Sequence, residues 1–82
     1  MAADDTYVHY AESRAENARD SLMDLMEGLA HLPGFLGAEV LSSPEQPGLF
    51  LLMSRWAGEL PALDLPAETR AWSFVVEAVL PW

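Results

Sequence analysis

His9 is one of two histidines in this sequence, and it is a candidate for acid–base chemistry. It lies in the stretch "TYVHYAE" between Tyr7 and Tyr10, and an imidazole titrates close enough to neutral pH to act as a general base. The structural alternative is a histidine that is hydrogen-bonded within a subunit interface or at its rim. His31, near the expected end of a helix, is better explained as a cation that suits the helix dipole.

Arg55 is one of only four arginines in a chain without lysine. It directly precedes Trp56, and a guanidinium group there could fix an anionic substrate oxygen, such as that of a deprotonated phenol. The alternative is an ion pair with a glutamate of the sheet, either Glu39 or Glu77. A carboxylate that becomes buried on a sheet face must find such a partner or shift its pKa upward.

Four further side chains are candidates for the lining of a pocket. Trp56 and Trp72 could form walls for a flat aromatic ring, although large aromatic residues are more often simply part of a core. Tyr10 and Ser13 lie at or near the end of the same first strand as His9. Ser13 is also expected to cap the following helix.

Composition excludes several classes of function. There are no cysteines, and the two histidines have no acidic residue at ligand spacing, so we expect no metal site and no cofactor. A net charge of −9 would repel a phosphate backbone, so no nucleic-acid partner is expected. The sequence has neither a signal peptide nor an apolar run long enough to cross a membrane, which predicts a cytoplasmic protein with no membrane partner.

The first half of the chain predicts a strand followed by a helix. Residues 6–12 are mostly β-branched and aromatic, as in a strand. Ser13 and Glu16 have the spacing of a capping box, so the helix should begin there and end near Leu32, before Pro33-Gly34. Its apolar stripe recurs at intervals of three and four residues and consists of Ala15, Ala18, Leu22, Leu25, Met26, Leu29 and Leu32.

The second half predicts three strands. Residues 35–42 and 48–56 should form a hairpin around the proline-rich turn 43–48, and 70–80 should form the last strand. Residues 57–69 contain two prolines and should be irregular, in place of a full second helix. The sequence therefore predicts one α+β domain over residues 1–82, a split βαβ sandwich with a reduced second crossover, preceded by a flexible segment 1–5.

One helix cannot cover such a sheet. Four strands span about 19 Å, whereas a helix with its side chains is about 10 Å across. The opposite face would carry large apolar residues such as those of "LFLLM" (49–53), and a monomer rarely exposes a patch of that size. We therefore expect a homodimer in which two sheets pack face to face.

The segments "YAESRAENA" and "LPGFLGAEVLSSPEQPGLFLLMSRW" resemble the antibiotic biosynthesis monooxygenase (ABM) domains. The resemblance covers residues 7–56 and rests on the Leu-Pro-Gly-Phe turn, the hairpin and the strand that closes on Arg-Trp. It implies a ferredoxin-like fold with an antiparallel four-stranded sheet that forms a dimeric α+β barrel.

The resemblance also implies an activity. Some members of that superfamily oxygenate aromatic polyketides or quinols without metal or flavin, because the deprotonated substrate itself activates oxygen, whereas others degrade haem. The haem-degrading members carry an Asn where this sequence has Ser13, and a Trp and a His on the second helix that residues 57–69 replace, so haem degradation is disfavoured. A cofactor-independent monooxygenase of an aromatic, quinol-like or polyketide-like compound is implied. The alternative is a non-catalytic dimer that binds a small ligand or has a structural role.

Overall fold

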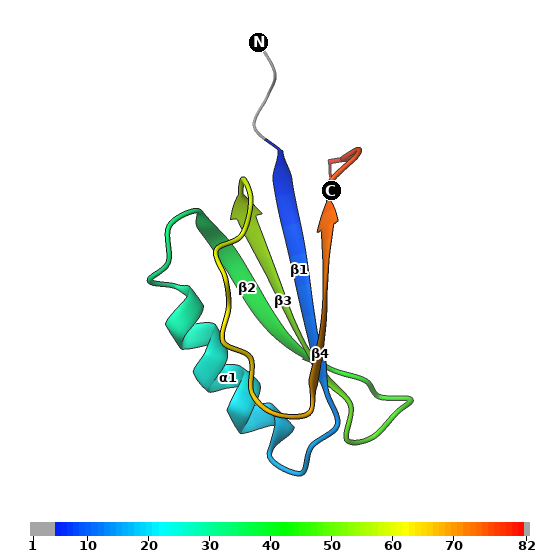
Figure 1. Cartoon of the computed structure of the whole chain (residues 1–82). Coiled ribbons are helices and arrows are strands. Elements are labelled where there is room, and N and C mark those ends of the chain that lie inside the picture. Colours follow the sequence, from blue (N-terminus) through cyan, green and yellow to red (C-terminus); the bar gives the residue numbers. More distant parts are fainter. Residues whose placement is uncertain (1–4, 82) are drawn as a thin grey trace.

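A computed structural model describes residues 5–81, which form one helix and a single four-stranded sheet (Figure 1). Every pair of neighbouring strands is antiparallel, and the strand order is β2-β3-β1-β4. This confirms the α+β, ferredoxin-like arrangement that the sequence predicted. Of the segment 1–5 that the sequence predicted to be flexible, residues 1–4 lie outside the described part. In chain order the elements are β1 (Thr6–Ser13), α1 (Ala18–Leu29), β2 (Phe35–Ser42), β3 (Phe50–Ala57) and β4 (Thr69–Val75).

The core lies between α1 and one face of the sheet, called here the helix face. Leu22 and Leu29 of α1 pack on the buried residues of the central strands, Ala11 of β1 and Leu52 and Trp56 of β3. Ala11 and Leu52 are partners in the ladder, and the small alanine lets the helix approach the sheet closely. The predicted apolar stripe therefore forms the core.

The start of α1 differs from the prediction. Ser13 is the last residue of β1, and its Oγ accepts a hydrogen bond from the Ala15 N–H at 3.2 Å instead of capping a helix at Glu16. The helix begins at Ala18 after Asn17, whose side chain makes no capping bond. The capping-box prediction was wrong because β1 pairs on both sides as far as Ser13, which holds this residue in an extended conformation.

The end of the last strand also differs from the prediction. β4 ends at Val75 instead of residue 80, and the Val76 N–H donates to the Thr6 carbonyl at 2.8 Å. Thr6 is the first residue of β1, so the ladder that β4 follows ends there. Strand propensity predicted a strand as far as residue 80, but a strand also needs a neighbouring strand to which it can hydrogen-bond.

Residues 58–66 contain neither helix nor strand and run along the helix face between α1 and β4 (Figure 1). Leu60 and Leu63 of this loop pack against the edge of the core. No helix within residues 5–81 is long and apolar enough to cross a membrane.

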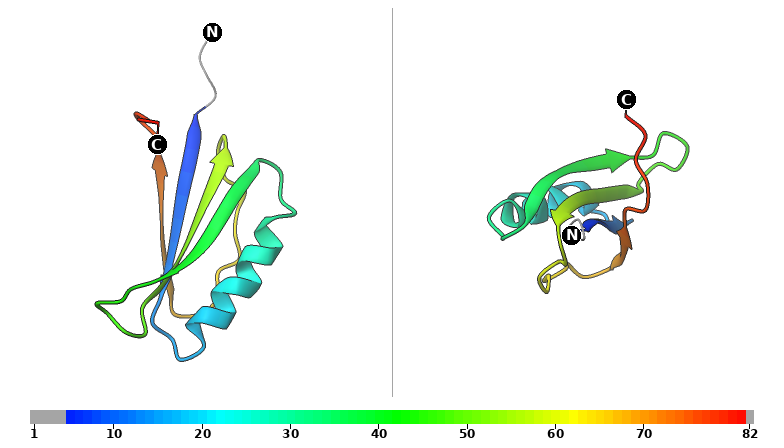
Figure 2. Two further views of the ribbon diagram at one scale, coloured as in Figure 1. Left: turned by 180° about the vertical axis from the view of Figure 1, so that it is seen from behind. Right: turned by 90° about the horizontal axis from the view of Figure 1, so that it is seen from above.

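The second face of the sheet, called here the open face, has no described element lying across it (Figure 2). Trp72 and Phe74 project from β4 on this face, and their side chains are 42% and 55% exposed. Tyr10 of β1 meets Phe74 edge to face, with 5.7 Å between ring centroids. The strand register adds Val8, Leu41, Leu51, Met53, Glu12, Glu39, Arg55 and Arg70 to this face.

A substitution at Gly34 tests how closely the turn after α1 packs against the end of β3. Its φ of +87° is unfavourable for other residues, and an added Cβ would lie 3.2 Å from the Ala57 carbonyl oxygen. We expect Gly34→Ala to lower the free energy of unfolding by about 1–2 kcal/mol in urea titrations. Gly28→Ala is the matched control, because Gly28 is helical and has open space around it; it should raise stability by about 0.4–1 kcal/mol. Equal effects of the two variants would contradict this account.

Candidate functional site

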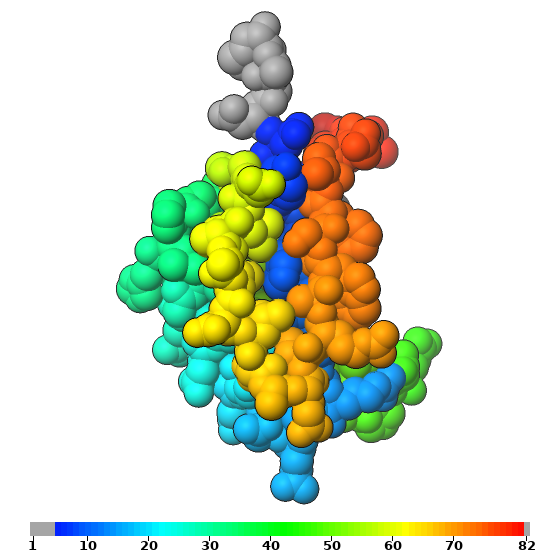
Figure 3. All heavy atoms as spheres, in the orientation of Figure 1, coloured from blue at the N-terminus to red at the C-terminus, as the bar shows by residue number. Residues whose placement is uncertain are grey.

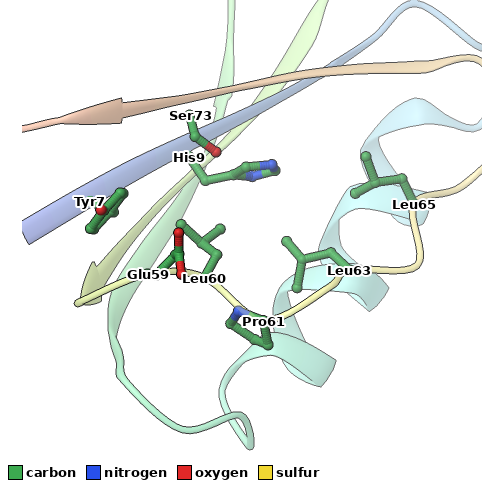
Figure 4. A pocket seen from close by; sticks show the side chains of 8 residues that line it. All are labelled: Tyr7, His9, Glu59, Leu60, Pro61, Leu63, Leu65 and Ser73. Carbon is green, nitrogen blue, oxygen red and sulfur yellow. The ribbon is translucent and has the colours of Figure 1, made fainter.

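A pocket of about 400 Å³ opens on the helix face between the loop 58–66 and β4. Figure 3 shows the hollow between the yellow loop and the orange β4, with the blue β1 at its base. Its floor comes from β1 and β4, and its outer wall comes from the loop (Figure 4). The lining residues are Tyr7, His9, Glu59, Leu60, Pro61, Leu63, Leu65 and Ser73.

The pocket exists because β4 directs small side chains toward the helix face. Thr69, Ala71 and Ser73 pair with the inward residues of β1, whereas the large Trp72 and Phe74 point to the open face. The helix α1 contacts β1, β2 and β3 but does not reach β4. Only the loop covers this part of the sheet, and it does not fill the space above the small residues.

His9 is the most unusual group in this pocket. Its side chain projects from β1 beside Ser73 and toward the leucines of the loop (Figure 4). The residue is only 7% exposed, and its Nδ1 is buried with no hydrogen-bond partner among residues 5–81. Buried polar atoms without a partner are rare in folded proteins, and leaving one unpaired costs free energy. Nδ1 has almost no accessible surface, so it is the rest of the imidazole ring that lines the pocket.

Burial also decides the charge of His9. Desolvation lowers the pKa of the imidazole, because removal from water disfavours the charged form. The ring is therefore neutral at pH 7 and keeps one nitrogen free to accept a proton. Its nearest neighbours in the ladder, Ser54 and Ser73, are uncharged.

Among residues 5–81, Glu59 is the only charged group that lines the pocket beside the neutral His9. It comes from the loop and is exposed, so its carboxylate lies at the solvent side of the site. Within residues 5–81, no group of three His, Cys, Asp or Glu side chains is arranged to hold a metal ion.

The structure separates the side chains that the sequence suggested as one site. His9 pairs with Ser54 in the ladder and lies on the helix face, whereas Arg55, one residue further along β3, is exposed on the open face. Trp72 also lies on the open face, where the Arg70 guanidinium stacks on it at 5.8 Å from the ring centroid. A pocket shared by His9, Arg55 and Trp72 is therefore excluded by the alternation of the strands.

The remaining aromatic candidates do not line the pocket. Trp56 is fully buried in the core, where its Nε1–H donates to Ser54 Oγ at 2.9 Å and its ring meets Phe35 edge to face. Tyr10 lies on the open face. Ser13 lies at the other end of β1, beside a smaller hollow of about 210 Å³.

The other charged candidates are exposed. His31 follows α1, outside its last turn. Glu39 is exposed on the open face, and Glu77 lies beyond the end of β4. No buried ion pair forms between Arg55 and either glutamate in the described residues.

Sequence reasoning missed Ser73 and Glu59 as lining residues. The signal for Ser73 was the alternation in "RAWSFV", where small and large side chains take opposite faces. The signal for the loop was the spacing of Leu60, Leu63 and Leu65, whose apolar side chains form the wall of the pocket. Glu59 left no recognisable signal, because its position depends on the path of an irregular loop.

The fold defines an α+β protein of the ferredoxin-like class. A family model for antibiotic biosynthesis monooxygenases matches residues 4–60, and the chain belongs to this family. Membership supports a monooxygenase-like or small-ligand-binding fold. Comparisons with curated proteins and with solved structures return no significant match. β4 lies beyond the matched residues, so Ser73 comes from a part of the chain that the family match does not cover.

The lowered pKa of His9 predicts a pH-dependent stability. In the unfolded chain, His9 has the ordinary histidine pKa of about 6.5. In the folded protein its pKa is lower, so the imidazole binds a proton only at lower pH. Stability should therefore be complete above this value and fall as the pH drops below it toward the lowered pKa of the folded state. Urea titrations between pH 7.5 and pH 5 measure this loss.

His9→Gln should reduce that loss, because the variant has no imidazole to protonate. His31→Gln is the matched control, since His31 is exposed, and it should keep the wild-type profile. If the two variants show the same profile, burial of His9 is not the cause of the dependence.

Proposed function

We propose that the protein is a small cofactor-independent monooxygenase that acts on an aromatic, quinol-like or polyketide-like compound bound in the His9 pocket. The observation that carries this proposal is a neutral, buried histidine whose Nδ1 has no partner within residues 5–81 and whose side chain lines a 400 Å³ cavity. Membership of the antibiotic biosynthesis monooxygenase family supports the class of reaction.

His9 has the properties of a general base. A general base must be unprotonated at the working pH, and it is most effective when its pKa lies near that pH. Burial lowers the pKa of His9 and so keeps its imidazole unprotonated. A phenolic or enolic hydroxyl of the substrate would donate its proton to the imidazole, and the resulting imidazolium would stabilise the substrate anion beside it.

The anion then reduces molecular oxygen. In an anthrone-like substrate the deprotonated ring system transfers electrons to O₂, and a carbon–oxygen bond forms at the ring CH₂ carbon. The peroxide takes up the proton held by His9, and its O–O bond breaks. One oxygen atom stays as the new carbonyl, and the other leaves as water with the two hydrogens of the CH₂ group. The substrate supplies all four electrons, so the balance requires neither metal nor flavin.

The loop provides the apolar surroundings that this step needs. Leu60, Pro61 and Leu63 form the wall opposite the sheet (Figure 4). Apolar contacts suit a flat ring, and exclusion of water strengthens the interaction between the substrate anion and the imidazolium.

Oxygen consumption with anthrone tests the activity. We expect one O₂ consumed per anthrone oxidised above the uncatalysed rate, and a loss of about 10²–10⁴-fold in His9→Gln, the range for removal of a general base. His31→Gln is the control and should keep the wild-type rate. An unchanged rate in His9→Gln would overturn the assignment of the base.

A second candidate function is a non-catalytic dimer that binds a small ligand. One observation favours it: no arginine lines the pocket, so no permanent cation stabilises a substrate anion. Under this alternative a quinol or anthrone binds to the wild type, while oxygen consumption stays at the uncatalysed rate.

We further propose that two copies of the chain pack through their open faces. Trp72 and Phe74 are exposed there beside Tyr10 and Met53, which leaves a continuous apolar surface. The distribution of charge also favours the open face as the interface between the two copies. The chain as a whole carries −9, whereas the open face holds Glu12, Glu39, Arg55 and Arg70, two acids balanced by two arginines. Two strongly acidic proteins repel each other least through such a face.

Light scattering at micromolar concentration tests the dimer. The wild type should give twice the mass of one 9.0 kDa chain. Met53→Glu, on the open face, should shift the protein toward monomer, because the carboxylate would be buried against the second copy. Met23→Glu, at a half-buried position of α1, is the control and should keep the dimer mass. A wild-type mass of one chain would contradict the proposal.

A further inference from the structure

We propose that the His9 pocket selects uncharged hydroxyarenes of two or three fused rings, whose hydroxyl donates to the imidazole, and rejects the corresponding carboxylates. This inference rests on the proposed function, since it names the class of substrate that the same site takes. It goes further because it follows from the charges that surround the pocket in this chain.

The polar groups of the pocket favour a ligand that donates a hydrogen bond. His9 lines the pocket as a neutral imidazole, and one nitrogen of a neutral imidazole is a hydrogen-bond acceptor. Ser73 lies beside it in the ladder, and its hydroxyl can accept from or donate to the same ligand. A ligand hydroxyl can therefore be satisfied on both its proton and its oxygen. An ether at the same position would leave the imidazole without a donor, which carries the cost of an unmade bond.

A carboxylate finds no compensating charge among the described residues that line this pocket. The chain has no lysine, and none of its four arginines lines the cavity. Arg55 and Arg70 lie on the open face, on the other side of the sheet. Arg14 and Arg19 are exposed between β1 and the early part of α1. An ionised ligand would therefore give up its hydration without gaining a salt bridge.

Glu59 adds repulsion to that cost. It is the acidic group among the lining residues, and it lies on the loop at the solvent side of the cavity. A carboxylate that enters past it approaches a like charge, which is unfavourable on top of desolvation. Tyr7 and Ser73, which also line the pocket, carry no positive charge that could offset this repulsion.

The volume and shape set the size of the ligand. A cavity of about 400 Å³ falls at the lower end of the range of about 300–1,000 Å³ that is typical of small-molecule sites. Leu60, Pro61, Leu63 and Leu65 form an apolar wall along one side, and β1 and β4 form the other. A flat system of two or three fused rings fits between two such walls.

Equilibrium binding with three probes of the same ring system tests the selection. The probes are 1-naphthol, 1-methoxynaphthalene and 1-naphthoate, measured by calorimetry at pH 7, where the naphthol is neutral and the naphthoate is charged. We expect naphthol to bind at least tenfold more tightly than either of the other two. Comparable affinities for naphthol and naphthoate, or tighter binding of naphthoate, would overturn the proposal.

Two variants test separately the rejection of the carboxylate and the preference for a hydroxyl over its methyl ether. Glu59→Gln should tighten naphthoate binding several-fold and leave naphthol unchanged, whereas Glu45→Gln, an exposed glutamate in the turn between β2 and β3, should change neither. His9→Phe should abolish the preference for naphthol over its methyl ether. A preference that survives in His9→Phe would show that the imidazole is not the acceptor.

The binding assay contains no turnover, so its outcome is independent of the oxygenase assay. Selection of naphthol without anthrone oxidation would support this inference and contradict the proposed reaction. Anthrone oxidation that depends on His9, combined with equal binding of naphthol and naphthoate, would support the reaction and overturn the inference.

Discussion

The limited coverage of the sheet by its single helix is the constraint on which the rest of this structure depends. The helix α1 packs on the central strands and on β2, and it leaves β4 to a loop without regular structure. Two different surfaces result. On the helix face, the region above β4 is covered incompletely and becomes a pocket. On the open face, no described element covers the strands, and large apolar side chains remain exposed.

The two surfaces differ in the side chains that the strands direct to them. β4 directs Thr69, Ala71 and Ser73 toward the pocket and Arg70, Trp72 and Phe74 toward the open face. Small residues leave volume for a ligand, whereas large aromatic residues supply area for association with another protein. One strand therefore contributes to both the pocket and the proposed dimer interface, through its two opposite faces.

His9 is a departure from ordinary core chemistry. Most buried polar groups in folded proteins are hydrogen-bonded, and Trp56 next to the same strand follows this rule through its bond to Ser54. His9 does not follow it within the described residues, although it is almost as buried. A protein tolerates such a group where function requires it, because a base that is already satisfied cannot accept a proton from a substrate. The imidazole ring that carries this unpaired atom also lines a cavity.

The sequence by itself determined the order of the elements, the α+β class, the apolar stripe of α1 and the family, because these depend on local propensity, periodicity and short motifs. It also suggested His9 as a candidate general base. Only the tertiary structure decided which candidates share a site. His9 and Arg55 lie on opposite faces because His9 pairs with Ser54, and a register shifted by one residue would have put them together. The end of β4 and the path of the loop that brings Glu59 to the pocket were decided in the same way, by contacts between segments far apart in the chain, which local sequence patterns do not encode.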